Sequence, residues 1–154
     1  MDISFRGAVQ SDLPALTDMV HALYSEDPSP RQPTSEHTRN TFTELEKYPE
    51  KGRILLFESA GAIAGYAILV HFWSNEYGGN KIFIDEIFVL PSFREKGIAK
   101  AFFQYLEKDY SLQAVALELE VTPDNHAARR LYERIGFRPA KNAYFNKLIH
   151  YANT

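Results

Sequence analysis

The segment 94–99, Arg-Glu-Lys-Gly-Ile-Ala, has the composition of an anion-binding site at the start of a helix. The first N–H groups of a helix have no partners within the helix and carry the positive end of its dipole, so they bind phosphate well. Gly97 and Ala99 are small enough to let a phosphate approach the backbone, and Arg94 and Lys96 add positive charge. Taken alone, the segment is equally compatible with a glycine that eases a turn between solvated basic residues.

A second candidate segment covers residues 125–137. Asn125 and Tyr132 are seven residues apart, about two helical turns, so both side chains lie on one face of the expected helix. A capping asparagine and a core tyrosine would give the same pattern. Neither segment identifies a site by itself.

Hydrophobic periodicity predicts the elements that position these segments. An edge strand is expected at residues 3–5, and an amphipathic helix over 12–26 has Ser11 as its expected N-cap. After a loop with three prolines at 27–33, the pattern predicts a helix over about 34–48, an antiparallel meander of strands at 54–57, 63–73 and 81–89, a helix at 97–110, a strand at 115–121, a helix at 125–135 and a final strand at 144–151. The strand, helix and strand between residues 81 and 121 form a βαβ unit.

Composition excludes several other classes of protein. A chain of 154 residues fits one domain, 1–154, and its net charge of −3 disfavours a nucleic-acid-binding surface. There is no cysteine, so disulfides, thiolate metal sites and a cysteine nucleophile are excluded, and the five histidines show no ligand spacing, so we expect no metal. No apolar run is long enough to span a membrane and no secretory signal precedes residue 11, so we expect a cytoplasmic protein with no membrane partner.

Taken together, the two segments and the order of elements resemble the GNAT acyltransferase superfamily. The first signature of that family, Arg or Gln, two residues, Gly, one residue and then Gly or Ala, is matched by Arg94, Gly97 and Ala99. The later signature is matched by Asn125, Ala128, Leu131, Tyr132, Gly136 and Phe137. Residues 84–91 are similar to the fourth strand of the family, particularly in its polyamine and thialysine acetyltransferase branch.

The resemblance implies an α/β (α+β) GNAT fold. That fold has a mixed, mostly antiparallel twisted sheet of about 6–7 strands with about 4 helices, and its parallel fourth and fifth strands are splayed apart. Acetyl-CoA is the implied cofactor and lies in the gap between them. The residues expected to bind it are Ile87, Phe88, Val89, Arg94, Glu95, Lys96, Gly97, Ile98, Ala99, Lys100, Asn125 and Ala128.

Within that set, the resemblance implies distinct roles. The backbone of Ile87 and Val89 would pair with the pantetheine arm, and the N–H groups from Glu95 to Lys100 would hold the pyrophosphate. Asn125 would contact the pantetheine arm, and Tyr132 would protonate the departing thiolate. Glu95 departs from the commonest pattern, which has Gly after the Arg, and its carboxylate would repel a pyrophosphate by roughly 1 kcal/mol unless it points into solvent.

The implied reaction is acetyl transfer to a primary amine of a small molecule, and the absence of cysteine favours direct attack within a ternary complex. Asp85 and Glu86 are the candidate bases that would take the ammonium proton, directly or through a water. Adjacent residues on a regular strand point to opposite faces, so only one is expected to reach the amine unless a bulge intervenes. One of the pair as a surface charge bonded to Lys or Arg stays an alternative.

The acceptor side is expected to combine aromatic and acidic residues, which suit a cationic amine. The candidate acceptor residues are Tyr24, Glu26, Trp73, Glu76 and Tyr77. Two other functions stay open, a non-catalytic CoA-binding or regulatory module and a protein N-terminal or lysine acetyltransferase. The final strand at 144–151 also leaves a homodimer open, since it could pair with a second copy.

Overall fold

The computed structural model describes residues 2–150, which fall into two compact units, Met1–Glu120 and Val121–Thr154. The first unit contains the sheet and three of the helices, and the second contains the helix α4 (His126–Arg134). The expectation of one domain over 1–154 stays a prediction. Each unit is described separately below.

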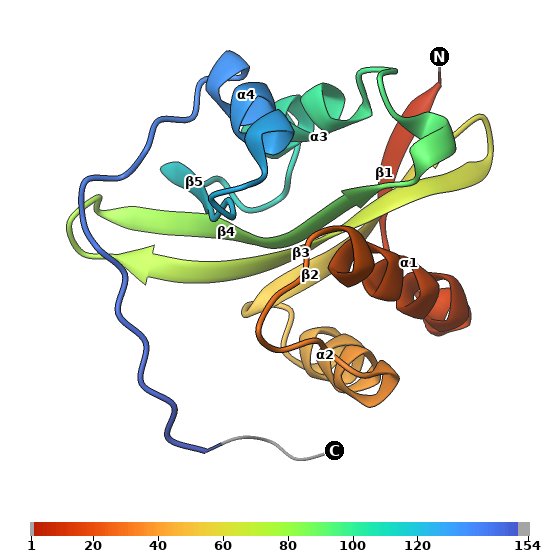
Figure 1. The fold of residues 1–154 in the computed structure, drawn as a ribbon, viewed down its shortest axis with the longest axis horizontal. Helices are drawn as coiled ribbons and strands as arrows, with labels where there is room; N and C mark the ends of the chain where they lie inside the picture. The colour runs from red at the N-terminus through yellow and green to blue at the C-terminus, as the bar shows by residue number, and fades with distance from the viewer. Residues whose placement is uncertain (1, 151–154) are drawn as a thin grey trace. The chain divides into compact units, whose positions relative to one another are not determined.

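The first unit is built around a mixed sheet whose strands lie in chain order (Figure 1). The strands are β1 (Ile3–Gly7), β2 (Gly52–Ser59), β3 (Ala62–Ser74), β4 (Gly79–Val89) and β5 (Ala116–Leu119). Neighbours from β1 to β4 pair antiparallel, and β4 pairs with β5 parallel. The predicted edge strand, meander and parallel fourth and fifth strands are therefore confirmed.

The number of strands is smaller than the six to seven expected. The described residues form five strands, and residues 144–150 of the expected final strand form none, while Tyr151 lies outside the described residues. Tyr144, Phe145 and Ile149 are each at least 80% exposed. Aromatic and branched side chains favour a strand only where a neighbouring strand and a buried face are available, so their composition alone did not define one here.

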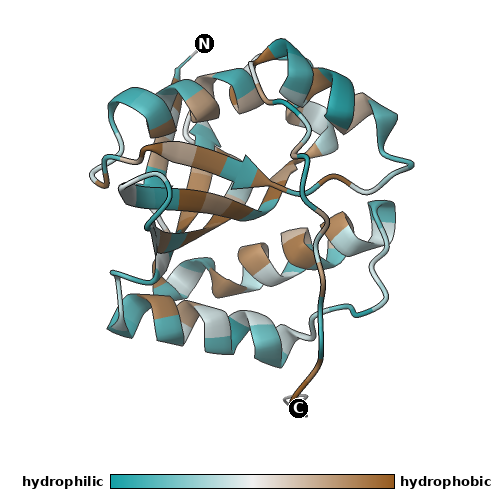
Figure 2. Cartoon of the chain, turned by 90° about the vertical axis from the view of Figure 1, so that its left-hand side faces the viewer, coloured by the Kyte–Doolittle hydropathy of each residue, from teal (hydrophilic) through white to brown (hydrophobic). Residues whose placement is uncertain are grey.

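Helices cover the two faces of this sheet (Figure 1). On one face lie α1 (Leu13–Glu26) and α2 (Ser35–Lys47), which bury Leu16, Met19 and Phe42 against the sheet. On the other face α3 (Ile98–Lys108) buries Phe102, whose ring centroid lies 4.7 Å from that of Phe57. Figure 2 shows the apolar residues concentrated on the strands and on the helix faces turned towards them.

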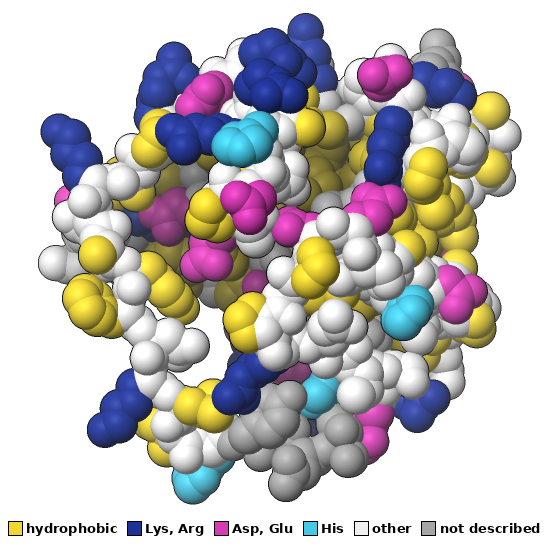
Figure 3. All heavy atoms as spheres, viewed as in Figure 1, with side chains coloured by type: hydrophobic (Ala, Val, Ile, Leu, Met, Phe, Trp, Pro, Cys, Tyr) yellow, Lys and Arg dark blue, Asp and Glu magenta, His cyan; other side chains and the backbone are white. Residues whose placement is uncertain are grey.

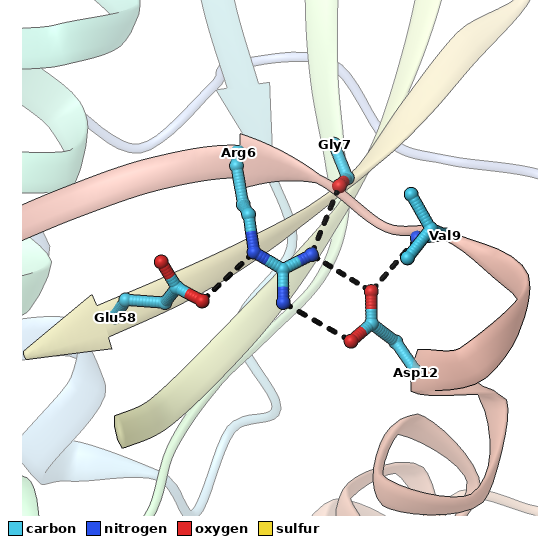
Figure 4. A network of polar contacts seen from close by, with 5 residues as sticks. All are labelled: Arg6, Gly7, Val9, Asp12 and Glu58. Carbon is cyan, nitrogen blue, oxygen red and sulfur yellow. Dashed lines mark hydrogen bonds and ion pairs between the residues drawn. The ribbon is translucent and has the colours of Figure 1, made fainter. Parts of the chain in front are cut away.

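The start of α1 is fixed by an ion-pair network rather than by the expected Ser11 cap (Figure 4). Arg6 on β1 donates to both carboxylate oxygens of Asp12 at 2.8 and 3.0 Å and to Glu58 of β2 at 2.8 Å. Asp12 also accepts the N–H of Val9 at 2.8 Å. Because Asp12 is nearly buried, these bonds replace the water that its carboxylate loses.

The surface carries charges of both signs. Figure 3 shows acidic and basic side chains distributed over the visible face, with neither sign covering it. In the described part of the chain, no helix is long and apolar enough to cross a membrane.

Candidate active site

A bulge interrupts β4 at the two candidate carboxylates, Asp85 and Glu86. Ile84 pairs with Leu69 of β3 and Glu86 pairs with Ile68, which leaves Asp85 as an extra residue on β4. A bulge interrupts the alternation of a regular strand, so neighbouring side chains can share a side. The charge of Asp85 also helps to raise the pKa of Glu86.

Glu86 is held by two tyrosine hydroxyls. Tyr66 of β3 donates to one carboxylate oxygen at 2.7 Å, and Tyr24 of α1 donates to the other at 3.0 Å. Burial raises the pKa of Glu86, the two hydrogen bonds oppose that rise, and Asp85 adds to it. Burial and the neighbouring carboxylates in turn raise the pKa of both phenols, so these hydroxyls stay protonated donors.

Tyr66 is a site residue that the sequence analysis did not identify. It is fully buried within β3, in a segment for which the sequence predicted a strand and no site residue. The available signal was its hydroxyl group, because a buried tyrosine in an otherwise apolar run needs a hydrogen-bond partner. Sequence alone does not indicate that this partner is Glu86.

Asp85 lies in a different environment. It is partly exposed, and in the described residues no hydrogen bond to its carboxylate is found. Its pKa is raised, first by desolvation from the surrounding protein and then by the negative charge of Glu120, which follows β5. The Asp85 carboxylate is therefore accessible and easier to protonate than an ordinary aspartate.

Beyond the bulge, β4 presents a backbone edge away from β3. Pairing with β5 ends at Ile84 and Leu119, so within residues 2–150 no strand pairs with that edge further along β4. The N–H of Leu90 donates to Ala64 on the β3 side, so the groups of Ile87 and Val89 point to the open edge and those of Phe88 towards β3. An extended ligand could pair with this edge as a strand would.

The loop between β4 and α3 has two residues in the left-handed region. Glu95 has φ 61° and Gly97 has φ 79°, and a Cβ added to Gly97 would meet no atom within 4 Å. The first backbone bond of α3 runs from Ala101 N–H to the Gly97 carbonyl, so the N–H groups of residues 98–100 have no partner within the helix. The loop thus presents free donors beside open space, as a phosphate site requires.

The basic side chains of this loop turn back onto the protein. Arg94 donates to the Val89 carbonyl at 2.9 Å and to both carboxylate oxygens of Glu26 at 2.9 and 2.7 Å. Lys96 donates to the Ser92 carbonyl at 2.9 Å. In this conformation both side chains are engaged by protein groups. The next three residues form the first turn of α3, where Ile98 is buried in the core and is followed by Ala99 and Lys100.

The second signature lies on α4 in the second unit. Asn125 is the N-cap of α4, and its side-chain oxygen accepts the N–H of Ala128 at 3.1 Å. Tyr132 lies two turns further on and is half-buried, with its ring centroid 5.9 Å from that of Phe137. Gly136, with φ 106°, follows the helix end, where a left-handed residue is common.

The candidate acceptor residues separate into three places. Tyr24 bonds to Glu86, and Glu26 bonds to Arg94. Trp73, Glu76 and Tyr77 lie at the β3–β4 hairpin, five residues along β3 from the partner of Glu86, or roughly 16 Å of strand. The Tyr77 ring there stacks under the ammonium group of Lys81 at 4.0 Å.

Three comparisons with known proteins bear on this site. The family model of the acetyltransferase (GNAT) family matches residues 17–137, which is most of the chain. No curated protein sequence matches the chain.

The described residues hold no cluster of three or more histidine or carboxylate side chains suited to a metal.

Many solved structures share the fold. One, described as a possible acetyltransferase from Clostridium difficile 630, has 22% identity and a TM-score of 0.80, covering 96% of this chain and 99% of that one. A ribosomal-protein-alanine N-acetyltransferase from Brucella melitensis biovar Abortus 2308 has 20% identity and a TM-score of 0.76, with 96% and 100% covered. The aminoglycoside N-acetyltransferase AAC(6')-Iy, in complex with CoA, has 18% identity and a TM-score of 0.71, with 96% and 95% covered.

The family model spans both signature segments, and the fold has the parallel β4 and β5 that the resemblance implied. The chain belongs to the GNAT family of acetyltransferases.

Proposed function

We propose that the protein transfers an acetyl group from acetyl-CoA to a primary amine of a small molecule, by direct attack within a ternary complex. The observation that carries this proposal is the bulge of β4, which sets Asp85 and Glu86 beside a free strand edge. Acetyl-CoA supplies the activated acetyl group. The residues of this chain bind it, orient the amine and move the protons.

The cofactor would be bound mainly by backbone groups. The Val89 carbonyl already accepts from Arg94, and the rest of the edge at Ile87 and Val89 suits an extended amide-containing arm. The N–H groups from Glu95 to Lys100 suit a pyrophosphate. The space above Gly97 admits the anion. On α4, Asn125 and Ala128 would contact the pantetheine arm.

Asp85 is the better candidate for the proton acceptor. Both oxygens of Glu86 already accept tyrosine hydroxyls, whereas the Asp85 carboxylate is accessible and its pKa is raised towards the working range of a general base. Because its oxygens are already bonded to the tyrosines, Glu86 would act on the incoming ammonium group through its negative charge rather than by binding it directly. Tyr132 would give a proton to the departing thiolate.

Support for a small cationic acceptor comes from the negative charge of this region and from the aromatic groups beside it. Tyr24 and Tyr66 adjoin the carboxylates, and Glu120 adds a further negative charge near Asp85. AAC(6')-Iy, which shares the fold, has been solved with a bisubstrate analogue, CoA-S-monomethyl-acetylneamine. The hairpin residues Trp73, Glu76 and Tyr77 would contact only a long acceptor.

The test is thiol release from acetyl-CoA in the presence of a panel of diamines, amino acids, aminoglycosides and short peptides. We expect release that depends on a small amine, and we expect Tyr132→Phe to reduce it by about 100-fold, the usual contribution of a general acid. Release with peptides alone would indicate a protein acetyltransferase. Tight CoA binding without release for any amine would indicate a non-catalytic module and contradict the proposal.

A further inference from the structure

The last turn of α1 contacts two separate parts of the candidate site. The Tyr24 hydroxyl donates to Glu86 on β4 at 3.0 Å. Two residues later, Glu26 accepts two hydrogen bonds from Arg94, which is the first residue of the loop before α3. One helical turn is therefore bonded both to the carboxylate pair and to the loop with the free backbone donors.

Arg94 is fixed by three different groups. Its Nε donates to the Val89 carbonyl at 2.9 Å, its Nη2 donates to Glu26, and its guanidinium lies 5.4 Å from the centroid of the Phe88 ring. The Arg94 and Glu26 side chains are 41% and 46% exposed. A half-exposed arginine loses much of its freedom only when several partners hold it, and Glu26 is the one charged partner among the three.

The electrostatics of α1 favour the same arrangement. Glu26 is the last residue of α1, so its negative charge lies at the negative end of the helix dipole. No basic residue in the last turn of α1 offsets this charge. Arg94 brings a positive charge to that end from a segment 68 residues away. The pair therefore offsets the unfavourable position of Glu26 while it anchors the loop.

We propose that Glu26 is a positioning residue for the cofactor, which fixes Arg94 and through it the backbone of the pyrophosphate loop at residues 94–97. This inference rests on the proposed function. It differs from the expectation that Glu26 binds the acceptor amine, since both of its oxygens are occupied by Arg94. Because Tyr24 holds Glu86 from the same turn, α1 joins the cofactor loop to the carboxylate pair.

The test is calorimetric titration of CoA into the parent protein, Glu26→Ala, Glu26→Gln and Glu44→Ala. Loss of the pair should loosen the loop and weaken CoA binding about threefold or more in Glu26→Ala, and by less in Glu26→Gln, which keeps one hydrogen bond. Glu44→Ala is the matched control, because Glu44 and Lys51 form a half-exposed ion pair at 2.6 Å that lies away from the loop. It should bind CoA as the parent does.

Kinetics and thermal unfolding distinguish positioning from a general loss of structure. Glu26→Ala should raise KM for acetyl-CoA, leave kcat within about twofold and melt close to the parent, since half-exposed pairs add little stability. CoA binding by Glu26→Ala that equals that of the parent would overturn the inference, and tighter binding would show in addition that Glu26 repels the pyrophosphate. A parent protein that does not bind CoA would overturn the proposed function, and this inference with it.

Discussion

Asp85 and Glu86 are neighbours in the chain, yet their surroundings differ. Two phenols hold the oxygens of Glu86, whereas the carboxylate of Asp85 is accessible and adjoins the charge of Glu120. In both residues burial is the main cause that raises the pKa. The two predictions at this scale test these environments separately.

The first prediction concerns the tyrosine that holds Glu86. Tyr66→Phe removes a hydrogen bond that lowers the pKa of Glu86, so the acidic limb of the pH profile of kcat/KM should move to higher pH. Tyr110→Phe is the matched control, because it removes a buried hydroxyl that bonds to His71 instead, at 2.9 Å. An acidic limb that is unchanged in Tyr66→Phe would contradict this role.

The second prediction concerns the cost of ionising Asp85. Because burial raises its pKa in the folded state above the ordinary value of 3.8, the folded state binds this proton more tightly than the unfolded state. The contribution of this group to the free energy of unfolding is therefore fully present in acid and is lost as the pH rises through the folded-state pKa. Asp85→Asn removes that loss, so it should be more stable than the parent at neutral pH, while activity falls.

Urea unfolding at neutral and acidic pH measures this difference. The gain of Asp85→Asn over the parent should disappear in acid, where both proteins are uncharged at this position. Glu107→Gln, which neutralises an exposed carboxylate on α3, should show no comparable gain. Equal stability of Asp85→Asn and the parent at neutral pH would show that the carboxylate is fully solvated.

At the scale of elements, Glu95 has an unusual backbone conformation within the loop between β4 and α3. Its φ of 61° lies in the left-handed region, which a glycine adopts without strain and which costs other residues about 1 kcal/mol or more. From the sequence, Glu95 is unusual only for its negative charge near the expected pyrophosphate. The structure adds a problem of backbone conformation at the same position.

A pair of variants separates these two effects. Glu95→Ala removes the charge and keeps the strain, whereas Glu95→Gly removes both. We expect Glu95→Gly to be more stable than Glu95→Ala by about 1 kcal/mol in chemical unfolding, although glycine ordinarily destabilises. Glu95→Ala as the more stable of the two would mean that the loop is not held in this conformation.

The network at the start of α1 gives the second prediction at this scale. Arg6 holds the pKa of Asp12 below its ordinary value, so the network stabilises the protein above that value and the stabilisation is lost as the pH falls through the folded-state pKa. Asp12→Asn should lower the free energy of unfolding by about 1–2 kcal/mol at neutral pH, a range that takes the partial exposure of Arg6 into account. Urea unfolding should show this cost shrinking in acid; a cost independent of pH would contradict the ionic origin.

Periodicity predicted most elements of the sheet unit within a few residues, but it carried no information on register. The bulge at Asp85 depends on which residues of β3 and β4 face each other, and the Glu26–Arg94 pair joins residues 68 apart. Tyr66 is not recognisable as a site residue from the sequence, because its partner Glu86 lies on the next strand, 20 residues away. Residues 144–150 have the composition of a strand and form none, since composition does not supply a pairing edge.

At the scale of the whole molecule, the two family signatures lie in different compact units. Arg94, Gly97 and Ala99 belong to the first unit, and Asn125 and Tyr132 belong to the second. The family model nevertheless spans both, from residue 17 to residue 137. We therefore expect the loss of either signature segment to abolish acetyl transfer.

The most direct test follows an isotopic label from the acetyl group of acetyl-CoA, with and without the best amine of the panel. Direct attack predicts that the label appears on the amine, that no label stays on the protein when the amine is omitted, and that Asp85→Asn transfers the label much more slowly than the parent. Label bound covalently to the protein without amine, or no transfer to any amine, would contradict the account.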